Sequence, residues 1–407
     1  MPTRRDRKLS ATASALLLCL GTSACGDAAI DASNTPAPPA NDSATDRATD
    51  QVAAAPSDVP PFGFLARVDA LIQPDEAHFT ELYQITRGGE NAEAYWNSTS
   101  DRLVLQRRET RESSDCDRIY LTGADGALTQ ISDGRGVTTC AYFMPGDTSV
   151  IYASTGAAHT LCPGMPTAPA GVARGYMWAL HPEYELYVHD LATDTARALT
   201  NSVGYDAEAT LSPLGDRIVF TSTRSGDVEL WTCALDGSAP VQVTNEVGYD
   251  GGAFFSHDGA KLVFRSTEFL ADSREADIDE YQRLLAANLV KPSRMELYVC
   301  NADGSGRQKL TQLGGANFAP FFTPDDSHVV FASNFENAAA RGPFFDLFMV
   351  PVGGGPHGAD DVKRITTYSG FDSFPMFSPD GKWLAFSSNR GGATEGETNV
   401  FVARWKD

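Results

Sequence analysis

The sequence lacks several features that would mark common classes of protein. The apolar stretch at residues 11–20 is too short to span a bilayer. Neither Gly-x-Ser-x-Gly nor His-Glu-x-x-His occurs, and the seven histidines are scattered along the chain. No linear motif for a serine hydrolase or a zinc peptidase is therefore present, and the prediction leans away from an enzyme.

Positive charge is also scarce. The chain has 32 Lys and Arg against 53 Asp and Glu, a formal net charge of −21. Residues 1–25 contribute four basic side chains and one acidic one, so the remainder carries −21 − 3 = −24. Nucleic acid and a bare anionic membrane surface are disfavoured as partners, whereas basic peptide segments and cations are favoured. The simpler interpretation is that the charge keeps an exported protein soluble.

The first 25 residues have the pattern of a bacterial export signal. A basic start is followed by the apolar stretch and by Thr22-Ser23-Ala24-Cys25. The small residues before Cys25 resemble a lipobox, although Thr22 stands where that family prefers Leu. The resemblance implies lipidation of Cys25, and ordinary secretion is the alternative. Gly26 follows the cysteine in place of an Asp that would favour the inner membrane, so the outer membrane is preferred.

Residues 26–58 consist largely of Ala, Pro, Ser, Thr and Asp. Such a segment cannot bury enough apolar surface to offset its ordering entropy. We expect a disordered tether, with the folded domain at residues 59–407.

One unit is repeated six times in this domain. It begins with a large apolar anchor residue, continues through a polar turn and ends in an apolar run, with the first and last apolar residues nine apart in every copy. The copies are 96–105, 143–152, 211–220, 255–264, 322–331 and 377–386. The spacing predicts two strands of a hairpin around a tight turn.

A second hairpin follows each first one. Its leading strand recurs at 118–121, 185–188, 229–232, 296–299, 346–349 and 399–402. The fourth strands end in an apolar residue and a hydroxyl, as in Ile85-Thr86 and Val243-Thr244. The earliest of these fourth-strand segments, 79–86, precedes the first blade. In the last blade, no such segment follows Val402. We therefore predict an all-β, six-bladed β-propeller in which the N-terminal strand completes the last blade.

The repeat also resembles a known family. Ser378-Pro-Asp-Gly-Lys382, followed by an apolar run and Ser388-Asn-Arg390, is similar to the TolB-type, WD40-like (PD40) propeller repeat. The resemblance covers about residues 79–405 and is weakest in the turns of blades one and two. It implies a periplasmic binding and assembly module of the cell envelope. We expect no counterpart here of the domain that accompanies the propeller in TolB itself.

Every long insertion is expected on one face of the propeller, at 155–182, 268–294 and 334–343. The same face carries polar residues five positions before each anchor, and two glutamates two positions further in. The predicted ligand-binding residues at this channel mouth are Asn91, Glu93, Asp206, Glu208, Asp250, Asn317 and Asp372. They would form an acidic funnel, or else cap the turns between blades. The insertion of blade four is expected to contain a helix over this face, begun by a capping box of Asp272 and Glu275.

Three cysteines, Cys116, Cys140 and Cys162, fall on the loop face of blades one and two. One disulfide is plausible in an oxidising compartment, with Cys140 joined to Cys162 or Cys116 preferred. A zinc site that uses His159 and Cys162 is the alternative.

These observations favour a monomeric, non-enzymatic protein-binding module in the periplasm, in contact with the membrane only through its anchor. The expected partners are envelope proteins or basic peptide segments. The alternatives are a peptidase-like hydrolase and a metal or small-ligand binder at the acidic mouth. No cofactor is expected, and whether a metal binds is left open.

Overall fold

The computed structural model describes residues 61–407 except 64, 111, 113, 173–174 and 339–343. The predicted export signal, the lipidation site Cys25 and the tether lie outside the described residues. Among the residues that are described, no helix has the length and apolarity needed to cross a membrane.

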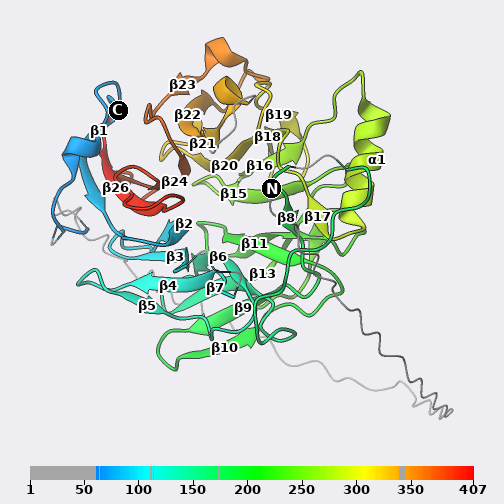
Figure 1. The fold of residues 1–407 in the computed structure, drawn as a ribbon, viewed down its shortest axis with the longest axis horizontal. Helices are drawn as coiled ribbons and strands as arrows, with labels where there is room; N and C mark the ends of the chain where they lie inside the picture. The colour runs from blue at the N-terminus through cyan, green and yellow to red at the C-terminus, as the bar shows by residue number, and fades with distance from the viewer. Residues whose placement is uncertain (1–60, 64, 111, 113, 173–174, 339–343) are drawn as a thin grey trace, which may run out of the picture. The chain divides into compact units, whose positions relative to one another are not determined.

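Six four-stranded antiparallel sheets are arranged around a central axis as the blades of a propeller (Figure 1). The innermost strands run from the long-loop face to the short-turn face. They are β2 (Glu90–Trp96), β6 (Thr138–Phe143), β11 (Asp206–Leu211), β15 (Asp250–Phe255), β20 (Asn317–Phe322) and β24 (Asp372–Phe377). The predicted six-bladed all-β fold is confirmed.

The other strands of each blade follow outward. The second strands are β3 (Leu103–Arg108), β7 (Ser149–Ser154), β12 (Arg217–Ser222), β16 (Lys261–Thr267), β21 (His328–Ser333) and β25 (Trp383–Ser388). The third strands are β4 (Arg118–Thr122), β9 (Glu185–Asp190), β13 (Glu229–Ala234), β18 (Met295–Asn301), β22 (Asp346–Pro351) and β26 (Asn399–Trp405). The outer strands are β5 (Leu128–Gln130), β10 (Thr195–Ala198), β14 (Val241–Gln242), β19 (Gln308–Lys309), β23 (Lys363–Arg364) and β1 (Phe79–Gln84).

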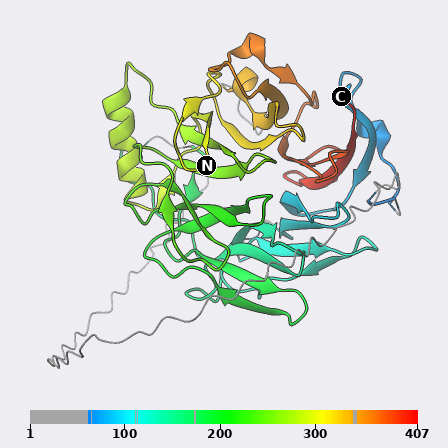
Figure 2. The ribbon, with the colours of Figure 1, turned by 180° about the vertical axis from the view of Figure 1, so that it is seen from behind.

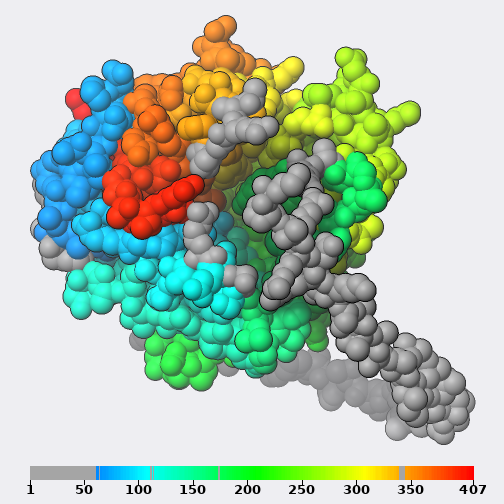
Figure 3. Space-filling view, in the orientation of Figure 1, coloured from blue at the N-terminus to red at the C-terminus, as the bar shows by residue number. Residues whose placement is uncertain are grey.

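The ring is closed by the two ends of the propeller. Strand β1 pairs antiparallel with β26, with Tyr83 opposite Val402 and Gln84 opposite Phe401. Figure 3 shows the N-terminal segment in blue beside the C-terminal strand in red. The predicted closure by residues 79–86 is confirmed, and it leaves the last blade without an open edge.

The repeated hydroxyl and the repeated anchor residue have visible roles. Each hydroxyl at the end of a fourth strand accepts a hydrogen bond from a backbone N–H near the start of the third strand, as Thr244 does from Leu230 and Thr86 does from Val400. The six anchors, from Trp96 to Phe377, are all buried between blades. Polar strand ends and apolar anchors therefore fix the register within blades and the packing between them.

The long insertions add structure to one face. Short strands β8 (Trp178–Ala179) of blade two and β17 (Leu289–Val290) of blade four pair with each other. Helix α1 (Arg274–Leu285) packs beside β17, and Figures 1 and 2 place it at the periphery of the ring rather than over the axis. Three short 3₁₀ segments complete the described elements: η1 (Asp69–Leu71), η2 (Phe335–Asn337) and η3 (Ala359–Asp361).

The predicted capping box of α1 is wrong. The N-cap is Ser273 rather than Asp272, and its hydroxyl donates to the carboxylate of Asp277. That carboxylate also accepts a hydrogen bond from the backbone N–H of Leu270. The acidic residue that organises this end of the helix is therefore Asp277, not Glu275.

Candidate functional site

The polar residues five positions before each anchor are buried in the junctions between blades. Asp206 accepts a hydrogen bond from Arg224 at 2.6 Å, Asp250 from Arg307 at 2.5 Å, and Asp372 from Arg390 at 2.8 Å. All three aspartates are at most 1% exposed. Their charges are thus compensated by arginine side chains, a structural role that differs from both the predicted funnel and the predicted capping of turns.

The two asparagines at this position are also fully buried. The side-chain amide of Asn91 donates to the carbonyls of Gly88 and Thr398, and its oxygen accepts from Arg107. Asn317 donates to the carbonyl of Met295 and accepts from Ser333. The predicted funnel residues are therefore brought to one end of the channel, but these five of the seven are fully buried and bonded within the propeller.

The remaining two, Glu93 and Glu208, face the channel for a reason that the sequence did not reveal. Each innermost strand contains a β-bulge three residues before its anchor, where the backbone has a positive φ. The bulge re-aims that side chain toward the axis. The six residues at the bulges are Glu93, Cys140, Glu208, Gly252, Ala319 and Phe374.

All six bulge residues line one cavity of about 20 Å³. Because they come from six different blades, this cavity, hereafter the channel pocket, must lie on the axis. Its volume suits one or two water molecules or a small cationic group.

The channel pocket is closed toward the short-turn face by aromatic rings. Tyr95 of blade one and Phe254 of blade four lie on opposite sides of the axis, and their ring centroids are 5.8 Å apart. Tyr142 and Phe321 extend this layer on either side. Within the described part of the chain, this aromatic layer closes the channel pocket on its short-turn side.

One wall of the channel pocket holds a compensated ion pair. Arg265, from β16, bonds to Glu208 and donates to the hydroxyl of Tyr249 at 2.7 Å, and that hydroxyl donates to Glu208 at 2.5 Å. The guanidinium also lies over the ring of Trp178, 4.9 Å from its centroid. This arrangement neutralises Glu208 and fixes Arg265 against the insertion of blade two.

The other carboxylate, Glu93, has much weaker partners. The Tyr95 hydroxyl lies 3.5 Å from it, and the Cys140 thiol donates to it. Burial raises the pKa of Glu93 to about 7, and the nearby Glu208 adds to this effect. Burial also raises the pKa of the Cys140 thiol well above its usual range, so the thiol stays protonated and is a poor nucleophile.

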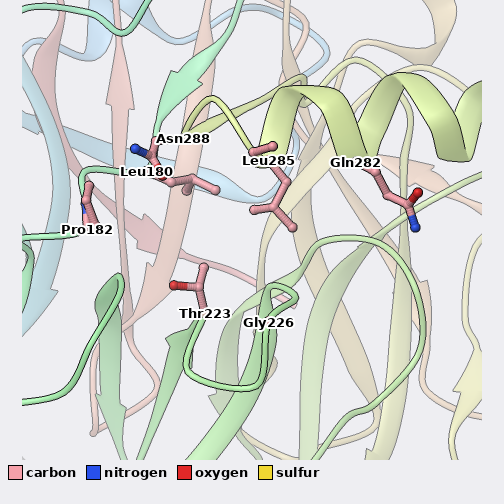
Figure 4. A pocket seen from close by; sticks show the side chains of 8 residues that line it. Leu180, Pro182, Thr223, Gly226, Gln282, Leu285 and Asn288 are labelled. Atoms are coloured by element: carbon pink, nitrogen blue, oxygen red, sulfur yellow. The ribbon is translucent and has the colours of Figure 1, made fainter.

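A second, larger cavity of about 450 Å³ lies near the rim of the long-loop face. Figure 4 shows Gln282 and Leu285 of α1 on one side, Leu180 on another, and Thr223 of blade three below. This rim cavity is formed by the insertions of blades two and four together with the β12–β13 loop.

The cysteines pair differently from the preferred prediction. A disulfide joins Cys116 and Cys162, with Cα atoms 5.7 Å apart, and Cys140 is free. A disulfide to Cys140 is wrong because its bulge points the thiol into the channel. The alternative zinc site loses its Cys162 ligand, and within the described part of the chain no group of three His, Cys, Asp or Glu side chains could hold a metal.

Comparisons with known proteins support the fold. No family model matches the sequence. TolB from Acinetobacter baumannii aligns with a TM-score of 0.50 and 17% identity, over 75% of this chain and 64% of that one. A protein provisionally identified as TolB from Agrobacterium tumefaciens has a TM-score of 0.48 and 14% identity, over 78% and 91% of the two chains. A gluconolactonase from Xanthomonas campestris has a TM-score of 0.49 and 11% identity, over 84% and 94%. At these identities the likeness establishes a propeller like that of TolB and assigns no activity.

Proposed function

We propose that this chain is a non-enzymatic binding module of the bacterial cell envelope, which docks a protein partner on the long-loop face of its propeller. In this proposal Cys25 carries the lipid that anchors the chain to a membrane, with the outer membrane preferred. Residues 26–58 then hold the propeller away from that membrane in the periplasm.

The observation that carries the proposal is the distribution of exposed apolar side chains. Among the described residues, six large ones lie on connections of the long-loop face: Leu161, Met165, Tyr176, Val203, Leu270 and Phe344. Of the other two, Leu214 lies in a short turn of the opposite face and Val241 on outer strand β14. Apolar groups gathered on the face that also carries the long insertions are typical of a protein-binding surface.

The net charge favours a basic partner. An excess of carboxylates accelerates the encounter with a positively charged protein and disfavours acidic competitors. Apolar contacts from Tyr176 and the other five exposed apolar residues of this face would then supply much of the affinity.

Site-specific photo-crosslinking in intact cells tests the docking face. A photoreactive phenylalanine analogue at Tyr176, which is 74% exposed, should give a discrete crosslinked species. The same analogue at Leu214, which is 63% exposed on the opposite face, is the matched control and should give none. Equal crosslinking at both positions, or none at either in a folded protein, would contradict the proposal.

The anchor has its own test. Cys25→Ala should abolish incorporation of labelled fatty acid and move the protein from the membrane to the soluble fraction. Cys19→Ala, within the apolar stretch, should change neither. Membrane retention of Cys25→Ala would exclude lipidation at this residue as the anchor.

A further inference from the structure

We infer that the channel pocket is a subsite for a primary ammonium group, of the kind that a lysine side chain of a docked partner would insert from the long-loop face. The inference deepens the proposed function and depends on it, because the proposed partner is what would bring the lysine to this face. It is argued from the two channel carboxylates, the shape of the pocket and its aromatic floor.

The two carboxylates in the pocket, Glu93 and Glu208, differ in how far neighbouring groups neutralise their negative charge. Glu208 is bonded to both Arg265 and Tyr249. Glu93 forms no ion pair with any residue that the structure describes, and it has only a thiol and a hydroxyl beside it. A carboxylate that is half-buried and has no cation beside it is costly, so Glu93 is the group that a ligand cation would stabilise.

The shape of the pocket suits an ammonium better than a larger cation. A volume of about 20 Å³ accommodates a group of the size of one or two water molecules. The rings of Tyr95 and Phe254 form the floor, and the face of an aromatic ring attracts cations. A planar guanidinium needs more room, and the described residues provide no three-ligand group for a metal ion.

A second polar group in the pocket also points to a ligand. Arg265 lines the same cavity, its side chain is only 9% exposed, and its Nε has no acceptor among the described residues. The pocket therefore contains two polar groups whose bonding is incomplete, Glu93 and Arg265.

The depth of the pocket matches the reach of lysine. Each bulge residue follows by two positions the buried polar residue at the channel mouth, as Glu208 follows Asp206. Two residues correspond to about 6–7 Å along a strand. That distance is about the length of the four-carbon stem of lysine. The stem would lie between the small side chain of Ala319 and the ring of Phe374.

Binding should depend on pH through Glu93. The charged and titratable groups that act on it are Glu208, Arg265, Asp117 and the Cys140 thiol. Of these, Glu208 and Asp117 oppose ionisation of Glu93, whereas Arg265 and the thiol favour it. Because the pKa of Glu93 is about 7, the carboxylate that attracts the ammonium predominates at pH 8 and is mostly protonated at pH 6.

The test uses two probes that differ only in the charge of their head group: Nα-acetyl-lysine methylamide and its Nε-acetylated counterpart. Binding to the full chain is measured by ligand-detected NMR at pH 8 and pH 6. The lysine probe should bind the wild type at pH 8 and more weakly at pH 6, and the acetylated probe should not bind. Glu93→Gln should weaken binding at least tenfold, whereas Glu275→Gln, an equal charge change on exposed α1, should have no effect.

A second variant distinguishes the contribution of the Glu93 charge from that of the space in the pocket. Ala319→Leu fills the pocket without removing a charge, and it should also abolish binding of the lysine probe. Circular dichroism checks that each variant is folded. Binding of the lysine probe to Glu93→Gln within twofold of wild type, equal binding of the acetylated probe, or no binding to the wild type would overturn the inference. Since no partner is present, such a failure is distinguishable from failure of the docking face in the crosslinking experiment.

Discussion

Gly252 leaves the space that the guanidinium of Arg265 occupies, because a Cβ atom at Gly252 would lie 2.5 Å from Arg265 Nη1 and 2.8 Å from Cζ. Gly252 is the bulge residue of blade four, where the backbone has a φ of +60°. The absence of a side chain at this bulge therefore lets Arg265 reach Glu208 of the neighbouring blade.

This relationship predicts that Gly252→Ala is unusually destabilising. The added methyl group must displace Arg265, which weakens its bond to Glu208, in addition to the strain of alanine at positive φ. We expect a loss of about 2–4 kcal/mol in the free energy of unfolding, measured by urea denaturation.

The matched control for this prediction is Gly146→Ala. Gly146 also has a positive φ, of +86°, but an added Cβ there would meet no atom within 4 Å. It should lose only about 1 kcal/mol, the cost of the backbone strain. Equal losses at the two sites would show that Arg265 is not held in place through Gly252.

A second prediction concerns the dependence of stability on pH. The pKa of Glu93 is raised from an ordinary value of 4.5 to about 7, so its ionisation destabilises the folded state. This group's stabilising contribution is complete below about pH 4.5 and is lost as the pH rises through about 7. Glu93→Gln should therefore be more stable than the wild type at pH 8, by on the order of 2 kcal/mol, and similar to it at pH 5. Thermal unfolding of both proteins at the two pH values measures this, with Glu275→Gln as the control without such a difference.

The sequence was sufficient to predict the fold because the repeat encodes both periodicity and register. Anchors such as Trp96 and Phe377 and strand-end hydroxyls such as Thr244 recur at fixed spacing, and a missing fourth strand implies ring closure. Each of these signals depends on local chemistry that is repeated six times, so a departure in one blade does not obscure it.

The site was only partly predictable, since the bulges depend on how the strands pair. Alternation along an ideal strand would not point the side chains of Glu93 and Cys140 at the axis. The sequence therefore did not predict that the six bulge residues line one pocket. One signal was available for Arg265. It occupies a second-strand position where the other blades carry uncharged residues: Gln106, Ala153, Thr221, Ala332 and Ser387. A large charged residue there, paired with the only glycine among the bulge residues, indicates a side chain that extends past the bulge toward the neighbouring blade.

The disulfide provides a third prediction. Cys116 and Cys162 are separated by 46 residues, and their bond connects the β3–β4 loop of blade one to the insertion of blade two. Closing a loop of this length should stabilise the protein by about 2–4 kcal/mol. The double variant Cys116→Ser and Cys162→Ser should lose that amount in chemical denaturation, whereas Cys140→Ser should lose less than about 1 kcal/mol.

Peptide mapping without reductant checks the pairing directly. It should recover a peptide containing Cys116 linked to one containing Cys162, while Cys140, Cys233 and Cys300 react as free thiols only after unfolding, because all three are buried. A peptide that links Cys140 to either partner would contradict the structure.

The fourth prediction concerns the closure of the ring. Arg390 is fully buried and bonds to Glu76, in the segment before β1, through two hydrogen bonds of 3.0 Å. It also bonds to Asp372 in the innermost strand of the last blade. One guanidinium therefore joins the segment that closes the ring to the blade that it completes.

Arg390→Met should consequently weaken the closure itself. It would leave the buried carboxyl groups of Glu76 and Asp372 without a cation, and removing one member of a buried ion group costs about 3–5 kcal/mol. Arg404→Met removes a partly exposed ion pair with Glu81 and should cost less than about 1 kcal/mol. Limited proteolysis should cut Arg390→Met, but not Arg404→Met, near residues 76–86.

The loss of stability caused by Arg390→Met should also be smaller at low pH. Burial already raises the pKa of Asp372, and Arg390 counteracts this effect. Without Arg390 the pKa rises further, so the stabilising contribution of the protonated form is lost as the pH rises through this higher value and is recovered as the pH falls. Urea unfolding at pH 5 should therefore show a smaller difference between Arg390→Met and wild type than unfolding at pH 8. A difference that does not change with pH would mean that lost packing of the arginine side chain, rather than uncompensated charge, weakens the closure.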